Sequence, residues 1–153
     1  MRFPAVEAFR GGAGLIRVVG HRGARGILPE NSMVGFEFAL SSGAPLLEFD
    51  VVMTRDEIPV ITHNHRLHAP SFRDAAGLFL SEEPKVAALS FAEIQRYDIG
   101  RLDGASAYGQ RFPDQAQLDR IRVPRLTDLL HLCAEPRHAQ AHLMLDVPSR
   151  MIT

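Results

Sequence analysis

The stretch PLLEFDVVMT, residues 45–54, constrains the fold of this chain more than any other segment. Its apolar residues run almost without interruption, which is typical of a strand covered on both faces in a parallel sheet. A second apolar run, residues 15–20, ends in glycine directly before His21 and Arg22, so both side chains are expected at the carboxyl end of a strand. A third run covers residues 141–147. Strands of this kind need covering helices, and the sequence therefore predicts an α/β protein.

Helical patterns separate these strands. Three helices are predicted from apolar spacing and end signals: one that starts after an N-cap at Asn31 or Ser32 and stops at Gly43, one from the capping box of Ser90 and Glu93 to about Tyr97, and one over residues 126–134. Residues 64–89 and 98–123 show no clear period and are interpreted as irregular. The order of strands and helices favours a largely parallel sheet.

The connection from residues 45–54 to the next predicted strand, residues 59–63, is short. A parallel crossover needs a dozen or more residues, so these two strands are expected to form an antiparallel hairpin. With the turn centred after Arg55, His63 falls opposite Glu48. A slip of one residue would turn His63 to the other face.

Two carboxylates interrupt the central apolar run. Glu48 and Asp50 are two positions apart, so in a strand they face the same side. Burying two unpaired like charges is costly. The alternative to a buried site is that both carboxylates lie on an exposed strand edge, where water or arginine side chains surround them. The apolar surroundings favour a divalent cation, because Mg²⁺ and Ca²⁺ prefer oxygen ligands. Asp146 interrupts residues 141–147 in the same way, although an ordinary acid at a strand end fits equally well.

His21 and Arg22 bring complementary chemistry to the end of a strand. An arginine fork binds phosphate oxygens, and a histidine beside it can donate or accept a proton near neutral pH. With His63 and a carboxylate-bound cation, the set suits phosphodiester cleavage. One imidazole would activate the attacking hydroxyl and the other would protonate the leaving alkoxide.

Composition disfavours several other classes of function. The formal net charge is -1 and the 17 Lys and Arg residues are scattered, so nucleic acid is not expected as a partner. No run reaches the roughly 18–20 apolar residues of a membrane span, and the start of the chain lacks a signal-peptide pattern, which favours a cytoplasmic location. The single cysteine, Cys133, is expected in the core. His65 and His68 follow His63 closely, but the oxygen-rich surroundings disfavour a transition-metal site.

The string HRGARGILPENS, followed by EFDVVMTRDEIPVITHN, resembles the glycerophosphodiester phosphodiesterase family. The likeness continues through YGQRFPDQ (108–115) and VPRLTDLL (123–130), and it covers about residues 15–147. The resemblance implies a (β/α)₈ TIM barrel of the phospholipase-C-like phosphodiesterase type, with the site at the carboxyl ends of the strands. It also implies metal-dependent hydrolysis of small glycerophosphodiesters to sn-glycerol 3-phosphate and an alcohol, a reaction of lipid and glycerol metabolism.

The resemblance implies a role for each candidate residue. His21 and His63 would be the catalytic acid/base pair, Arg22 would bind the substrate phosphate, and Glu48, Asp50 and Asp146 would hold Mg²⁺ or Ca²⁺. The family usually has a Glu-x-Lys pattern on the strand that carries Asp146, where this chain has Pro148 in place of the lysine. A proline cannot supply the positive charge with which that lysine would bind phosphate.

Length sets this chain apart from a full barrel, which typically needs about 250 residues. The chain has 153 residues, and an open half-barrel would leave a strand edge and an apolar face uncovered. We therefore expect residues 1–14 to be a lead-in and residues 15–153 to be the N-terminal half of the family domain, truncated after about half the barrel. The alternatives are a non-catalytic remnant that binds phosphate esters or a protein partner, and a related phospholipase.

Overall fold

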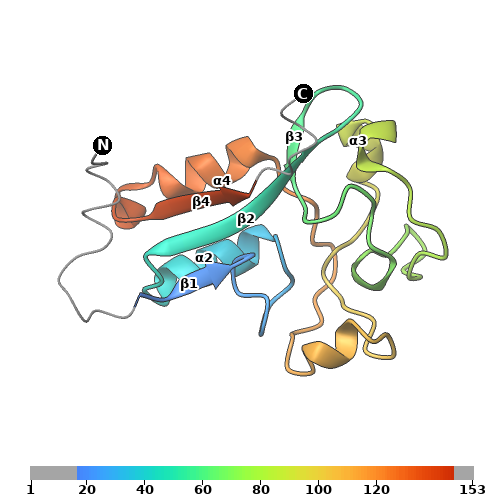
Figure 1. Ribbon diagram of the computed structural model, residues 1–153, viewed down its shortest axis with the longest axis horizontal. Coiled ribbons are helices and arrows are strands. Elements are labelled where there is room, and N and C mark those ends of the chain that lie inside the picture. The colour runs from blue at the N-terminus through green and yellow to red at the C-terminus, as the bar shows by residue number, and fades with distance from the viewer. Residues whose placement is uncertain (1–16, 147–153) are drawn as a thin grey trace.

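The structure, a computed structural model, describes residues 17–146 as a small α/β fold (Figure 1). The predicted lead-in over residues 1–14, and everything after residue 146, lie outside the described residues. In chain order the elements are β1 (Val19–His21), α2 (Met33–Ser41), β2 (Leu46–Met53), β3 (Pro59–Ile61), α3 (Phe91–Ile94), α4 (Leu126–Cys133) and β4 (His142–Asp146), with 3₁₀ turns at Ala69–Ser71, Val86–Ala88, Gly109–Arg111 and Pro136–His138. No described helix is long and apolar enough to cross a membrane.

The strands and helices predicted from the apolar patterns are confirmed, with changes at their ends. Ser32 is the N-cap of α2, since its Oγ accepts a hydrogen bond from the N–H of Gly35. The capping box of Ser90 and Glu93 opens α3, but that helix stops at Ile94. The prediction that it runs to about Tyr97 was therefore too long.

β2 is the centre of a parallel sheet in which it pairs with β1 on one side and with β4 on the other. Within residues 17–146, neither β1 nor β4 pairs with a further strand, so the sheet is open at both edges. Exposed apolar side chains on β4 include Leu143, Met144 and Leu145. A parallel sheet with two open edges is consistent with part of a barrel.

The hairpin between β2 and β3 is antiparallel as predicted, but the predicted register was wrong by one residue. Val51 pairs with Ile61, and continuing this pairing places His63 opposite Phe49 instead of Glu48. The loop is one residue longer than assumed, because the backbone of Thr54 bonds to Ile58. Within that loop Glu57 adopts a left-handed backbone conformation with φ 60°, as three-residue hairpin loops do.

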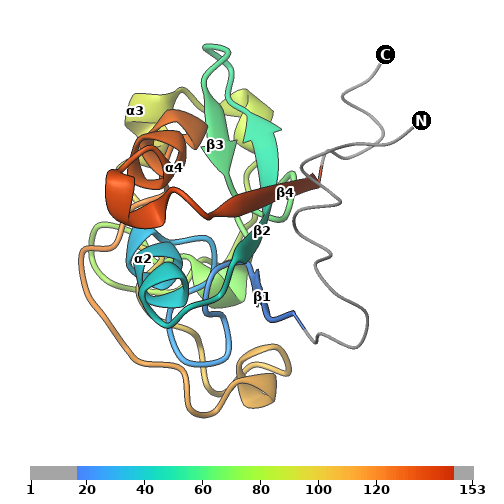
Figure 2. The same ribbon diagram turned by 90° about the vertical axis from the view of Figure 1, so that its left-hand side faces the viewer.

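The two faces of β2 pack against different parts of the chain. Leu47, Phe49 and Val51 belong to a core that includes residues of α2 and α4, which lie together on one side of the sheet (Figure 2). Cys133 packs against this core as expected, and burial raises the pKa of its thiol. On the other face, Glu48 and Asp50 are left for the site.

A second core lies beyond the hairpin and joins Val52 and Val60 to residues 64–123, which are mostly irregular apart from α3 and the 3₁₀ turns. Arg73 is buried in this region and links two of its segments, because it forms ion pairs with both Asp98 and Asp119. Sequence periodicity could not reveal such a network. Separate hydrogen bonds from Gln115 and Ala116 attach this region to the loop that follows β1.

Candidate active site

His21 ends β1 and lies beside the central strand. It is the register partner of Glu48, and its Nε2 is 3.6 Å from Glu48 Oε2. Arg25 donates a hydrogen bond to His21 Nδ1 over 2.8 Å. A guanidinium can only donate, so Nδ1 is the acceptor and Nε2 of the neutral imidazole carries its proton toward Glu48. Burial, followed by the positive charge of Arg25, lowers the pKa of His21 from its ordinary value.

The backbone after His21 turns sharply through Arg22, whose φ is 52°. The Arg22 N–H donates to the carbonyl oxygen of Glu48 at 2.9 Å and to its Oε2 at 3.0 Å. Gly23 continues the turn with φ 81°, and a Cβ there would lie 2.9 Å from the backbone of Gly35 in α2. A glycine is required at this point by both the dihedral angle and the close approach. His21, Arg22 and Gly23 thus form a turn, the HRG turn, that is hydrogen-bonded to the Glu48 carboxylate.

The guanidinium of Arg22 is buried among acidic groups. Its Nη1 lies 3.4 Å from Glu30 Oε1 and 3.4 Å from the hydroxyl of Tyr108, and its Nε lies 3.5 Å from Asp50 Oδ2. Nε has no hydrogen-bond partner among the described residues. All three distances are long for charge-assisted hydrogen bonds. The guanidinium is therefore surrounded by acceptors without being tightly bound by any of them.

The three predicted acidic ligands share one face of the sheet. Asp50 is buried and is the register partner of Asp146, and Glu48 lies two positions before Asp50. Asn31 donates to Asp50 Oδ2 over 3.5 Å, while its own Oδ1 is buried without a partner among the described residues. Across residues 17–146, however, no three His, Cys, Asp or Glu side chains come close enough together to hold a metal ion. The donors are of the oxygen type that Mg²⁺ and Ca²⁺ prefer, so their chemistry fits such an ion, although three of them are not gathered within residues 17–146.

His63 lies just beyond β3 and is exposed. Its Nδ1 is 2.8 Å from the side-chain oxygen of Asn64. In the part of the chain that the structure describes, His63 makes no hydrogen bond or ion pair with His21, Glu48 or Asp50. His63 therefore stays a prediction as the second acid/base residue.

Three residues of this region were not singled out by the sequence analysis: Arg25, Glu30 and Tyr108. Arg25 and Glu30 lie within HRGARGILPENS, yet nothing in their spacing distinguishes them from ordinary surface charges. Tyr108 comes from the irregular segment, and its hydroxyl donates to Glu30, 78 residues away in the chain. The resemblance of YGQRFPDQ to a family segment was the one available signal for Tyr108.

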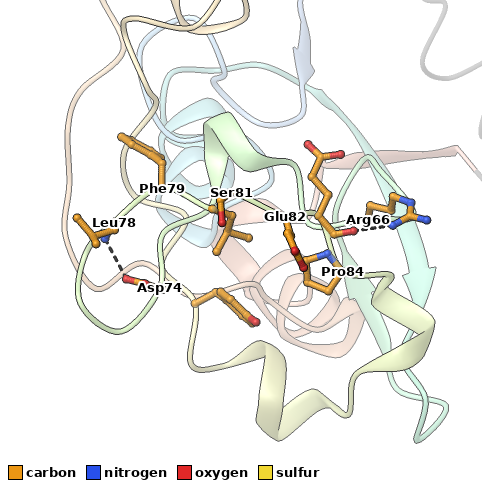
Figure 3. Close-up of a pocket in the computed structure, with 10 residues that line it drawn as sticks. Arg66, Asp74, Leu78, Phe79, Ser81, Glu82 and Pro84 are labelled. Atoms are coloured by element: carbon orange, nitrogen blue, oxygen red, sulfur yellow. Dashed lines mark hydrogen bonds between the residues drawn. The ribbon is translucent and has the colours of Figure 1, made fainter.

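A surface cavity of about 930 Å³ lies elsewhere in the irregular region (Figure 3). Its lining includes Arg66, Asp74, Leu78, Phe79, Glu82 and Pro84. None of the predicted site residues lines it. Cavity size therefore does not identify the site, which is defined by the cluster where the end of β1 meets Glu48 and Asp50 of β2.

The fold and this cluster define a class of protein: an α/β protein with a histidine, an arginine and carboxylates gathered at the carboxyl ends of parallel strands, suited to phosphate-ester chemistry. The chain belongs to the glycerophosphoryl diester phosphodiesterase family, whose model matches residues 21–152. Among curated relatives, a putative glycerophosphodiester phosphodiesterase of Bacillus subtilis, YhdW, is 30% identical over 96 residues, which are 63% of this chain and 36% of that protein. A glycerophosphodiester phosphodiesterase of the same organism is 29% identical over 117 residues, covering 75% and 35%.

Solved structures agree on the fold. A putative glycerophosphoryl diester phosphodiesterase from Silicibacter pomeroyi matches with a TM-score of 0.86 and 51% identity, over 90% of this chain and 46% of that one. An Oleispira antarctica phosphodiesterase in complex with the product sn-glycerol-3-phosphate matches with a TM-score of 0.61 and 25% identity, over 88% and 45%. The chain spans less than half the length of each of these relatives.

Proposed function

We propose that this chain carries the catalytic and phosphate-binding residues of an enzyme that hydrolyses glycerophosphodiesters to sn-glycerol 3-phosphate and an alcohol. One observation carries the proposal: β1 and β2 set His21 and Arg22 directly against Glu48 and Asp50. Membership of the family supports the reaction, and the bound product in the Oleispira antarctica relative supports the substrate class.

Arg22 binds the substrate phosphate in this proposal. Its guanidinium is buried, and its contacts of 3.4 to 3.5 Å with Glu30, Tyr108 and Asp50 leave N–H groups that a phosphate can take up. A planar guanidinium matches two phosphate oxygens at once, which fixes the orientation of the phosphorus atom. Charge on the phosphoryl oxygens is then offset where it develops.

His21 and His63 exchange protons with the substrate. Arg25 keeps His21 Nδ1 occupied, so the proton is exchanged at Nε2, which is the nitrogen on the side of Glu48. One of the two imidazoles would activate the attacking hydroxyl, and the other would protonate the leaving alkoxide. Each transfer is expected to contribute about 10²- to 10⁴-fold to the rate.

Glu48, Asp50 and Asp146 would hold a divalent cation, Mg²⁺ or Ca²⁺. The orphaned Oδ1 of Asn31 beside Asp50 is a further oxygen donor, and oxygen donors suit both ions. When bound, the cation supplies positive charge to the phosphoryl oxygens. The register pairing of Asp50 with Asp146 supports this ligand set.

A second candidate function is binding of phosphate esters without turnover. The open edges of the sheet and the exposed apolar side chains of β4 favour it for this chain by itself. So does Pro148, which stands where the family usually has a lysine.

The experiment that separates the two functions is incubation of the chain with glycerophosphocholine and Mg²⁺ or Ca²⁺, followed by ³¹P NMR. Conversion to sn-glycerol 3-phosphate supports the hydrolase. No conversion, together with calorimetric binding of sn-glycerol 3-phosphate that is lost in Arg22→Met, supports the phosphate-ester binder. Neither conversion nor binding would contradict both.

A further inference from the structure

Tyr108 reaches the site although it lies 86 residues after Arg22 in the chain. Its segment is attached to the loop that follows β1 by two hydrogen bonds. The side chain of Gln115 donates to the carbonyl oxygen of Arg25 over 2.8 Å, and the N–H of Ala116 donates to that of Ile27 over 2.9 Å. The position of Tyr108 is therefore coupled to that of the HRG turn.

The hydroxyl of Tyr108 lies among three charged groups, Glu30, Arg22 and Arg25. It donates its proton to Glu30 Oε2, and its oxygen is 3.4 Å from Arg22 Nη1. Burial, together with the negative charge of Glu30, raises the pKa of Tyr108, so the phenol keeps the proton that it donates. Glu30 itself stays 3.4 Å from Arg22 through its other oxygen.

The ring of Tyr108 is held from two sides. His68 packs edge-on against it with the ring centroids 4.8 Å apart, and Phe112 does the same at 5.4 Å. Such contacts restrict the ring without using its hydroxyl. Replacing the tyrosine by phenylalanine should therefore keep the packing and remove only the hydrogen bonds.

We infer that Tyr108 is a positioning residue that keeps Glu30 from closing onto Arg22, and so keeps the Arg22 guanidinium available for phosphate. The inference rests on the proposed function, in which Arg22 binds the phosphate of the substrate. A free carboxylate beside a buried guanidinium forms a tight, bidentate pair. By taking one oxygen of Glu30, the phenol prevents that pair, and the guanidinium keeps its long contacts instead.

The test is calorimetric binding of sn-glycerol 3-phosphate to the full chain. Tyr108→Phe should weaken binding by about tenfold, because Glu30 then competes with phosphate for Arg22. Combining Tyr108→Phe with Glu30→Gln should restore most of the affinity, since the competing charge is gone. A merely structural role for Tyr108 would not allow this rescue.

Tyr97→Phe is the matched control, because the chain has just two tyrosines and Tyr97 belongs to the cavity of Figure 3. This control should bind as the unchanged chain does. The chain has no tryptophan, so Tyr108 is the remaining tyrosine fluorophore in Tyr97→Phe, and its emission should change on adding sn-glycerol 3-phosphate.

Two outcomes would overturn the inference while leaving the proposed function standing. One is unchanged affinity in Tyr108→Phe alongside lost binding in Arg22→Met. The other is weakened binding in Tyr108→Phe that Glu30→Gln does not restore. If the unchanged chain binds no sn-glycerol 3-phosphate, the inference fails, and if it also converts no glycerophosphocholine, the proposed function fails with it.

Discussion

Arg22 and Glu48 are joined twice, because the N–H of Arg22 donates both to the carbonyl oxygen of Glu48 and to its side-chain Oε2. The carboxylate of Glu48 therefore has a structural task, as the acceptor for a strained turn, and a proposed chemical task, as a metal ligand. These two tasks can be separated by substitution, since an amide oxygen can replace the acceptor without replacing the charge.

Glu48→Gln should keep the fold but lose cation affinity. The amide oxygen can still accept from the Arg22 N–H, whereas a neutral ligand binds Mg²⁺ or Ca²⁺ far less well. Glu48→Ala should lose both the cation affinity and about 0.5–1.5 kcal/mol of stability, because the Arg22 N–H keeps its bond to the Glu48 carbonyl oxygen and loses the one to the side chain. Calorimetric titration with Mg²⁺ or Ca²⁺ and urea denaturation measure the two effects. Unchanged cation affinity in both variants would remove Glu48 from the ligand set.

Gly23→Ala should destabilise the protein by about 1–3 kcal/mol or more, because an alanine is strained at φ 81° and its Cβ would meet the backbone of α2. Gly26→Ala is the control in the same loop, since a Cβ there meets nothing within 4 Å. The free energy of unfolding from urea denaturation measures both variants. Equal stability of the two would show that the HRG turn is not constrained as described.

The stability of the irregular region should fall at acid pH through Asp119. Hydrogen bonds from Arg101 and Arg73 lower the pKa of Asp119 from 3.8 to about 2. A folded-state pKa below the unfolded one contributes stability that is present above about pH 4 and is lost as the pH falls toward 2. Thermal unfolding between pH 2 and 5 should therefore show a flatter dependence in Asp119→Asn than in the unchanged chain.

Asp114→Asn is the control for that experiment, because Asp114 is exposed and, within the described residues, forms no ion pair. Its pH dependence should match that of the unchanged chain. A dependence in Asp119→Asn as steep as in this control would contradict the role given to the Arg73 network.

Phe49→Ala should destabilise the protein by about 3–5 kcal/mol, because Phe49 is 1% exposed and packs edge-on against Phe36 at 6.1 Å. Its register partner Leu145 faces the same side of the sheet but is 44% exposed. Leu145→Ala should cost less than about 1 kcal/mol by comparison. Denaturant unfolding compares the pair, and similar losses would mean that the core does not lie where the structure places it.

Much of the fold could be predicted from local patterns. The apolar run of β2, with no alternation, indicated a covered strand, and Ser32 and Ser90 marked two helix starts. The register of the hairpin could not be predicted, because it depends on the left-handed backbone conformation of Glu57. Glutamate is not a residue type that indicates a positive φ.

The site, too, contains residues that local patterns could predict and residues that they could not. His21 and Arg22 lie at the end of β1, and Glu48 and Asp50 lie within β2. A local pattern and a family motif both point to these residues, and the structure brings them together. Local patterns could not predict the contribution of Tyr108, because its segment has no period and its position depends on long-range contacts; only the resemblance of YGQRFPDQ to a family segment pointed to it. Asp146 is aligned with Asp50, but the role of each as a ligand stays a prediction, as does that of His63.

The central claim, that His21 exchanges a proton with a glycerophosphodiester at the end of β1, is tested most directly by the rate of glycerophosphocholine hydrolysis in His21→Ala. His131→Ala, on α4 and away from the site, is the control. We predict that His21→Ala lowers the rate by about 10²- to 10⁴-fold while His131→Ala leaves it unchanged. Equal rates of hydrolysis in the two variants would contradict the account.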